Sequence, residues 1–153
     1  DIEDQIMGLD SRERETFMTE IGLKKTGLNK LIKEGYDLLN LDTFFAEKGF
    51  EKIICNRPDF EVHPNIQSNL IKKVAIEMGI SFEYHPLTFE NMNAENIGKQ
   101  MDFLNESERP VLAYCTSGTR CAAIWALGQI GKMSKDKILK TTLESGYNLE
   151  GLL

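Results

Sequence analysis

The chain has 153 residues, of which 41% are hydrophobic and 27% are charged, and its formal net charge is −6. This size and composition indicate one folded domain and exclude an intrinsically disordered chain. The acidic balance argues against nucleic-acid binding, which needs a basic surface, and the lack of any apolar run of ~20 residues argues against a membrane span.

The first part of the chain, residues 1–46, has a helical pattern. Ser11 precedes a charged stretch in which Phe17 and Met18 supply an apolar face, and this predicts a first helix. Leucine and isoleucine recur at helical spacing over residues 26–40 and predict a second helix. Such an apolar stripe normally packs against a core or an interface. We therefore expect a helical segment over 1–46 that offers a surface for a protein partner or a second copy of the chain.

From residue 47 onward, short apolar strands alternate with amphipathic helices. The predicted strands are 52–55, 81–84 and 111–114, and the predicted helices are 63–78, 93–104, 120–130 and 135–143. Strands joined by helices imply right-handed crossovers and a parallel sheet. We predict an α/β domain over 47–153, with a three-layer parallel sheet and helices on both faces. Such a sheet binds ligands at the carboxyl ends of its strands.

The third predicted strand runs directly into the loop 115–120 and then into a helix. In this arrangement the loop N–H groups can converge on one point, where the helix N-terminus adds partial positive charge. Gly118 permits a tight turn, and Arg120 offers a planar fork to an oxyanion. The predicted anion-binding residues are Thr116, Ser117, Gly118, Thr119 and Arg120.

Cys115 opens this loop. A thiolate at a helix N-terminus beside an arginine titrates below the ~8.5 of free cysteine, so we predict that Cys115 is the nucleophile. The alternative is a small buried residue, which the strand before it and the helix after it disfavour. Cys121 and Cys55 are expected to be buried in the core, and a resolving thiol is the alternative for Cys121.

Targeting and metal-binding signals are missing from the sequence. Residues 1–10 are acidic and lack the basic-then-apolar order of a signal peptide, so a cytoplasmic protein is expected. The three cysteines and two histidines lack the spacing of zinc ligands. We therefore expect neither a metal nor a cofactor.

Loop length and the supporting acid bear on the chemistry. Four residues separate Cys115 from Arg120, which is similar to rhodanese-type sulfurtransferases that carry sulfur as a persulfide. Cysteine phosphatases use a loop one residue longer, so the spacing favours sulfur transfer. A phosphatase also needs a general acid for the leaving oxygen. Asp59 is the leading candidate, with a turn-forming role as its alternative, and Glu90 and His85 are weaker candidates.

Four segments carry a family resemblance: 49–59, 84–87, 111–120 and 125–127. Through them, residues 49–132 resemble the phosphatase-like domain of the beta-lactamase-hydrolase-like proteins. Members of that family are described as phosphatase-like or as sulfurtransferases, some of them fused to a persulfide dioxygenase-like metallo-hydrolase.

The resemblance implies a fold like that of dual-specificity cysteine phosphatases. It implies Cys115 as nucleophile and Arg120 as anion ligand, with Arg57 and Asp59 at a strand end near the pocket. The expected function is a phosphatase-like hydrolase that acts on a small phosphorylated or sulfur-oxyanion substrate. A rhodanese-like sulfurtransferase with a Cys115 persulfide and a non-catalytic anion-binding or interaction module are the alternatives.

Residues 23–32 and 36–45 carry a second resemblance, to the stretch near the end of YchF-type P-loop ATPases. The sequence contains no Gly-rich Walker loop, so nucleotide hydrolysis is not implied. The chain looks like a junction of two unrelated pieces. Such a junction would remove the strand that the phosphatase-like family has before Gly49, and would expose an edge of the sheet.

Overall fold

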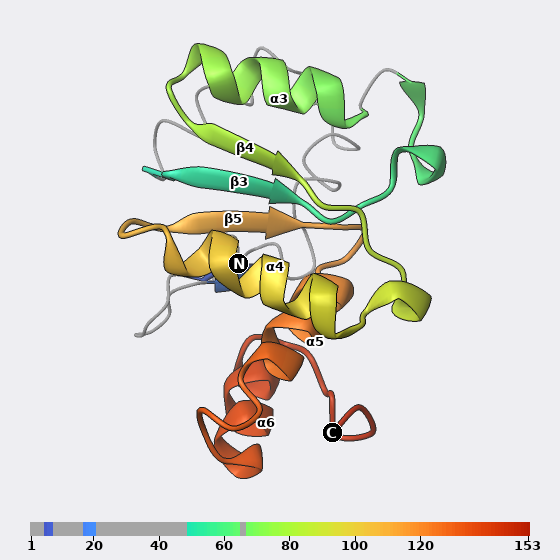
Figure 1. Ribbon diagram of the computed structural model, residues 1–153, viewed down its shortest axis with the longest axis vertical. Helices are drawn as coiled ribbons and strands as arrows, with labels where there is room; N and C mark the ends of the chain where they lie inside the picture. Colours follow the sequence, from blue (N-terminus) through green and yellow to red (C-terminus); the bar gives the residue numbers. More distant parts are fainter. Residues whose placement is uncertain (1–4, 8–16, 21–48, 65–66) are drawn as a thin grey trace.

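The computed structural model describes residues 5–7, 17–20, 49–64 and 67–153. Its strands are β1 (Gln5–Met7), β2 (Phe17–Glu20), β3 (Lys52–Cys55), β4 (Ser81–Tyr84) and β5 (Val111–Tyr114). Its helices are α3 (Ser68–Glu77), α4 (Ala94–Asn105), α5 (Thr119–Gly128) and α6 (Lys135–Glu144), with short 3-10 turns η3 (Asp59–Glu61) and η5 (Phe89–Asn91). The strands form one sheet in the order β2-β1-β5-β3-β4, as Figure 1 shows for its central part.

The centre of the sheet is parallel. Strand β3 pairs in parallel with β4 and with β5, so that Ile53 lies opposite Phe82 on one side and Leu112 on the other. All residues of β3 and β5 are buried, as expected for strands covered on both faces. The three predicted strands and the parallel α/β core are confirmed.

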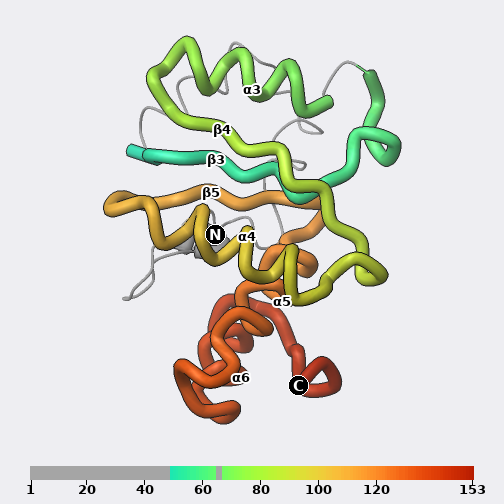
Figure 2. The backbone as a smooth tube through the Cα atoms, in the orientation of Figure 1, coloured from blue at the N-terminus to red at the C-terminus, as the bar shows by residue number. Residues whose placement is uncertain are grey.

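The two faces of the sheet pack against different helices. Ile53 and Leu112 belong to the core cluster that contains Ile71 of α3, whereas Ile54 belongs to a second cluster against Phe103 of α4. This alternation follows from the two-residue period of a strand. Helices therefore lie on both faces, and Figure 2 shows α4 and α5 side by side.

The predicted helix after Ser11 is wrong at Phe17–Glu20, which form β2. Strand β1 is antiparallel to β5, and β2 is antiparallel to β1. Backbone pairing along the open side of β5 outweighs the helical pattern of the sequence here, because strand formation depends on the neighbouring strand more than on local preference. The sequence analysis expected an exposed edge of the sheet, and β1 and β2 cover the side of β5 that faces away from β3. The predicted helix over 26–40 lies outside the described residues.

The helix boundaries follow local capping. Helix α4 begins where the Asn93 side chain accepts the N–H of Asn96 (2.9 Å), close to the predicted start. Helix α3 begins at Ser68, later than the predicted start at His63, and its first N–H donates to the Asp59 carboxylate (2.8 Å). None of the described helices is long and apolar enough to cross a membrane.

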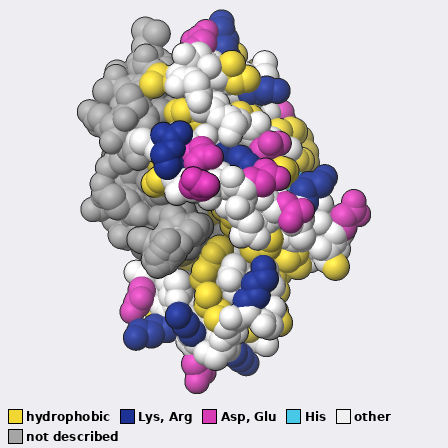
Figure 3. Space-filling model, turned by 60° about the vertical axis from the view of Figure 1, so that its left-hand side comes forward, with side chains coloured by type: hydrophobic (Ala, Val, Ile, Leu, Met, Phe, Trp, Pro, Cys, Tyr) yellow, Lys and Arg dark blue, Asp and Glu magenta, His cyan; other side chains and the backbone are white. Residues whose placement is uncertain are grey.

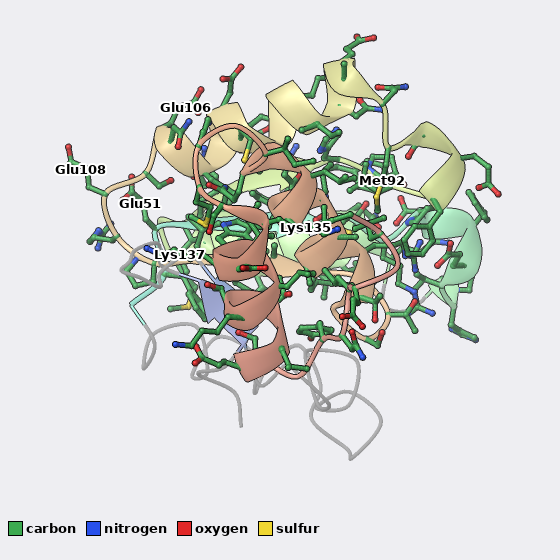
Figure 4. The ribbon with its side chains drawn as sticks, turned by 90° about the horizontal axis from the view of Figure 1, so that it is seen from below. Glu51, Met92, Glu106, Glu108, Lys135 and Lys137 are labelled. Atoms are coloured by element: carbon green, nitrogen blue, oxygen red, sulfur yellow. The ribbon has the colours of Figure 1, made fainter. Side chains whose placement is uncertain are left out.

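Acidic side chains gather at the amino ends of the strands. Figure 4 shows Glu51, Glu106 and Glu108 at one end of the sheet and Met92, which follows η5, at the other end. Glu106 pairs there with the buried Lys52 (Nζ to Oε1, 3.0 Å). Charges of both signs are interspersed over the face in Figure 3. The loop after β5 lies at the opposite, carboxyl end of the strands, away from this acidic group.

Candidate active site

The loop after β5 folds around the sulfur of Cys115. Gly118 adopts a left-handed conformation (φ +93°, ψ −8°) as the N-cap of α5, which a residue with a side chain would resist. Its N–H donates to Cys115 Sγ (3.2 Å), and the N–H groups of Arg120 and Cys121 also bind this sulfur. The loop amides thus converge on the sulfur of Cys115, and their predicted role in binding an anion stays a prediction.

The electrostatics of the loop favour a thiolate at Cys115. Burial acts to raise its pKa, but hydrogen bonds from the Cys121 thiol and N–H, the charge of Arg120 and the Arg120 N–H outweigh it. The pKa of Cys115 therefore falls from the usual 9.0 to about 5. Burial raises the pKa of Cys55 to about 11 and that of Cys121 well above its usual range. Of the three cysteines, Cys115 is the one expected to be ionised at neutral pH.

The Arg120 guanidinium is held by contacts from three segments. It forms a bidentate ion pair with Glu61 of η3 (2.9 and 2.8 Å), and its side chain is 12% exposed. Nη1 also donates to the carbonyl of Leu87 (2.8 Å), and Nη2 donates to Thr116 Oγ1 within the loop (2.9 Å). Arg120 therefore reaches the loop through Thr116 while Glu61 fixes its far side.

Glu61 lies between two arginines. Arg57 Nη2 donates to the Glu61 carbonyl (3.1 Å), and Arg57 Nε lies 3.6 Å from Glu61 Oε1. The hydrogen bond from Arg120 is the main reason that the pKa of Glu61 is lowered. Two guanidinium groups therefore share one carboxylate beside the loop.

Asp59 turns towards helix α3. Its carboxylate accepts the N–H and the hydroxyl of Ser68 (2.8 and 2.9 Å), and its own N–H donates to the Tyr84 hydroxyl (2.9 Å). Both carboxylate oxygens are thus engaged away from the loop. These contacts favour a structural role for Asp59, and its role as general acid stays a prediction.

The two weaker candidates for the acid lie in different surroundings. His85 is buried. Its Nδ1 lies 2.7 Å from Gln100 Oε1 and its Nε2 lies 3.3 Å from Asn96 Oδ1, so both ring nitrogens are within hydrogen-bond distance of side-chain oxygens. Gln100 in turn exchanges two hydrogen bonds with Asn56 (2.9 and 3.0 Å). Glu90 is exposed on η5.

The other residues that the sequence analysis singled out are the loop hydroxyls and the remaining cysteines. Ser117 and Thr119 share a hydrogen bond between their hydroxyls (2.9 Å) at the open side of the loop. Cys121 is buried, as expected, and its thiol lies 3.3 Å from Asn56 Oδ1. The three cysteines are free thiols.

Glu61 and Tyr147 also contact the loop or its arginine, and the sequence analysis missed both. Tyr147 donates from its hydroxyl to the carbonyl of Ser117 (2.9 Å). No local pattern marks Tyr147. Glu61 follows the carboxyl end of β3, and the rule that parallel sheets bind ligands at that end could have selected it.

Comparisons with known proteins agree with the fold. Residues 39–132 match the family described as "Beta-lactamase hydrolase-like protein, phosphatase-like domain". The crystal structure of a proposed phosphatase from Neisseria meningitidis Z2491 is 31% identical, with a TM-score of 0.65, and the match covers 72% of this chain and 80% of that one. Kinase-associated phosphatase, solved with its catalytic-site cysteine replaced by serine, is 15% identical with a TM-score of 0.56 over 90% of this chain and 70% of that one, which shows likeness of fold alone.

Two curated relatives match different parts of the chain. A beta-lactamase hydrolase-like protein of Xylella fastidiosa is 30% identical over 115 residues, which are 72% of this chain and 26% of that protein. The ribosome-binding ATPase YchF of Escherichia coli O157:H7 is 52% identical over 45 residues, which are 29% of this chain and 12% of that protein. Both resemblances are confirmed, and the chain spans only a minor part of either relative.

Proposed function

We propose that this chain, which belongs to the phosphatase-like domain family of the beta-lactamase hydrolase-like proteins, is a hydrolase of phosphate monoesters with Cys115 as its nucleophile. The observation that carries the proposal is the convergence of loop amides on Cys115 Sγ, with Gly118 N at 3.2 Å.

The reaction follows from the thiolate and its surroundings. The Cys115 sulfur attacks phosphorus, so that an S–P bond forms and the P–O bond to the leaving group breaks. The leaving oxygen takes a proton from solvent. Water then attacks the cysteinyl phosphate, which breaks the S–P bond, releases inorganic phosphate and restores the thiolate. The loop N–H groups that do not bind the sulfur are the proposed donors to the charge that develops on the phosphoryl oxygens.

Arg120 is the proposed ligand for the substrate anion. Nη2 of Arg120 donates a hydrogen bond to the Thr116 hydroxyl, and a substrate oxyanion can accept this hydrogen bond in place of the hydroxyl. Glu61 holds the guanidinium in position through its ion pair. Arg57 adds a second positive charge beside Glu61. The acidic group at the amino ends of the strands lies at the other end of the sheet, so it does not oppose anion binding here.

The two carboxylates near the loop are the groups that could protonate the leaving oxygen. Asp59 is bound to Ser68, and Glu61 is bound to Arg120. Neither carboxylate is free to protonate a leaving alkoxide, so we propose an aryl phosphate, whose phenolate leaves more readily. Two exposed aromatic residues are close in sequence to residues that bind Arg120. Phe60 precedes Glu61 and is 82% exposed, and Phe89 of η5, two residues after Leu87, is 58% exposed.

We propose that these two phenylalanines contact the aryl group of the substrate. Figure 1 shows that the turns after β3 and β4, which hold them, lie at the end of the sheet to which the strand arrows point. Replacing Phe60 and Phe89 by alanine should raise KM for an aryl phosphate and leave inhibition by inorganic phosphate unchanged. If the two replacements weakened inhibition by inorganic phosphate as much as they raised KM for the aryl phosphate, this contact would be contradicted.

Sulfur transfer is the second candidate, favoured by the four-residue spacing between Cys115 and Arg120 and by the engaged carboxylates. In that reaction the thiolate attacks the outer sulfur of thiosulfate, an S–S bond forms and sulfite leaves. An acceptor such as cyanide then takes the sulfur from the persulfide and restores the thiolate. No acid is needed, because sulfite leaves as an anion.

The test compares aryl phosphate hydrolysis with thiosulfate-to-cyanide transfer in the wild type, Cys115→Ser and the matched control Cys55→Ser. Hydrolysis that is lost only in Cys115→Ser supports the first candidate, and transfer lost only in that variant supports the second. Activity that survives in Cys115→Ser would refute both. If sulfate raises Tm without turnover, and Arg120→Ala removes that shift, the chain is a non-catalytic anion-binding module.

The division of the chain into 1–46 and 47–153 stays a prediction, as does the proposed role of the first segment as a surface for a protein partner or a dimer. A small anionic substrate is the partner that the loop itself supports. Deleting residues 1–46 also removes β1 and β2, so a change in oligomeric state must be compared with the loss of stability in the same variant.

A further inference from the structure

Tyr147 lies in the C-terminal segment after α6, beyond the residues 39–132 that match the family. Its backbone N–H donates to the Thr142 carbonyl (2.9 Å), and Gly146 makes the turn with φ +98°. The side chain is buried in the core cluster that contains Trp125. The packing of the ring is therefore provided by the core and does not depend on the hydroxyl.

The hydroxyl of Tyr147 nevertheless has a specific partner in the loop. It donates to the carbonyl of Ser117 (2.9 Å). That carbonyl shares a peptide group with the N–H of Gly118, and in a trans peptide the two point in opposite directions. The Gly118 N–H donates to Cys115 Sγ (3.2 Å). The peptide between 117 and 118 is thus held at both ends, by Tyr147 on one side and by the sulfur on the other.

We propose that Tyr147 is a positioning residue for Cys115, because its hydroxyl fixes the 117–118 peptide with the N–H on the sulfur. This inference rests on the proposed function, whose nucleophile it positions. A hydrogen bond to the carbonyl also polarises the peptide and strengthens its N–H as a donor. The residue acts through the loop and has no contact with the reacting phosphorus in this scheme.

The close fit of Tyr147 to this peptide is a second observation. A Cβ on Gly118 would meet the Tyr147 hydroxyl and would lie 2.9 Å from its Cζ. The ring edge therefore occupies the space beside the peptide that fixes the sulfur. Without the hydroxyl, the carbonyl of the exposed Ser117 would bond to water, and the peptide could rotate away from Cys115.

The test measures the pH dependence of Cys115 alkylation by iodoacetamide, with the modified residue identified by mass spectrometry. Tyr147→Phe keeps the ring and removes the hydroxyl. Tyr84→Phe is the matched control, because its hydroxyl binds the Asp59 N–H and not the loop. We expect the midpoint of the profile to rise by about one pH unit in Tyr147→Phe, the effect of one hydrogen bond to a charged group, and to stay unchanged in Tyr84→Phe.

The outcomes separate this inference from the proposed function. A Tyr147→Phe profile that superimposes on the wild type would overturn the inference and leave the hydrolase proposal standing. A displaced profile in a protein without turnover would support the inference and refute the hydrolase. Tyr147→Met, which also lacks the hydroxyl, should give the same displacement if Tyr147→Phe does not fold. An ordinary thiol midpoint in the wild type would overturn both.

Discussion

Replacement of Gly118 by alanine tests how tightly the loop is held. The left-handed conformation at φ +93° costs a residue with a side chain about 1–2 kcal/mol. The added Cβ would also crowd Tyr147, at 2.9 Å from Cζ, and overpacking of this kind costs about 1–3 kcal/mol. We therefore expect Gly118→Ala to lower the free energy of unfolding by about 2–5 kcal/mol.

The control for this change is Gly131→Ala. Gly131 has a similar φ of +88°, but nothing lies within 4 Å of its Cβ, so only the conformational cost of about 1–2 kcal/mol is expected. Denaturant unfolding measures both losses, and the alkylation profile of Cys115 should move to higher pH in Gly118→Ala alone. Equal losses of stability in the two variants, or an unchanged profile in Gly118→Ala, would refute the reasoning.

Three further predictions concern the ion pair between Glu61 and Arg120, the Asp59 carboxylate and the Cys115 thiolate. Glu61→Gln removes the bidentate partner of Arg120 and should lower kcat/KM for an aryl phosphate about tenfold, equivalent to about 1.4 kcal/mol of lost positioning; unchanged kinetics would contradict this. Asp59→Asn and Ser68→Ala should each cost about 1 kcal/mol of stability at the start of α3, and a fall in kcat confined to Asp59→Asn would identify a general acid. Because the pKa of Cys115 is lowered from 9.0 to about 5, the wild type should gain stability over Cys115→Ser as pH rises from 5 to 9 and lose it as pH falls through 5; a difference independent of pH in unfolding titrations would disagree.

The sequence predicts the centre of the fold well because its signals there are local. The strands over 52–55 and 111–114 are short apolar runs bounded by turn residues, and they become the fully buried β3 and β5. The loop 115–120 is likewise a contiguous pattern, and the Gly118 N–H within it donates to Cys115 Sγ.

The parts that the sequence could not predict depend on contacts between distant residues. The helical pattern around Phe17 gives way to a strand because β1 and β5 offer backbone partners that are not visible locally. Arg120 meets Glu61 across 59 positions, and Tyr147 meets Ser117 across 30. Spacing within one segment carries no information about such pairs, whereas the three-dimensional arrangement of the segments determines them.

The central claim is that the sulfur of Cys115 forms a covalent bond with the substrate. Its most direct test is mass spectrometry of the Cys115 peptide after rapid acid quench of the wild type with an aryl phosphate and, separately, with thiosulfate. We predict a phosphoryl group on Cys115 in the first sample, and a persulfide in the second if sulfur transfer is the reaction. Turnover without any adduct on Cys115, or an adduct on Cys55 or Cys121 instead, would contradict the account.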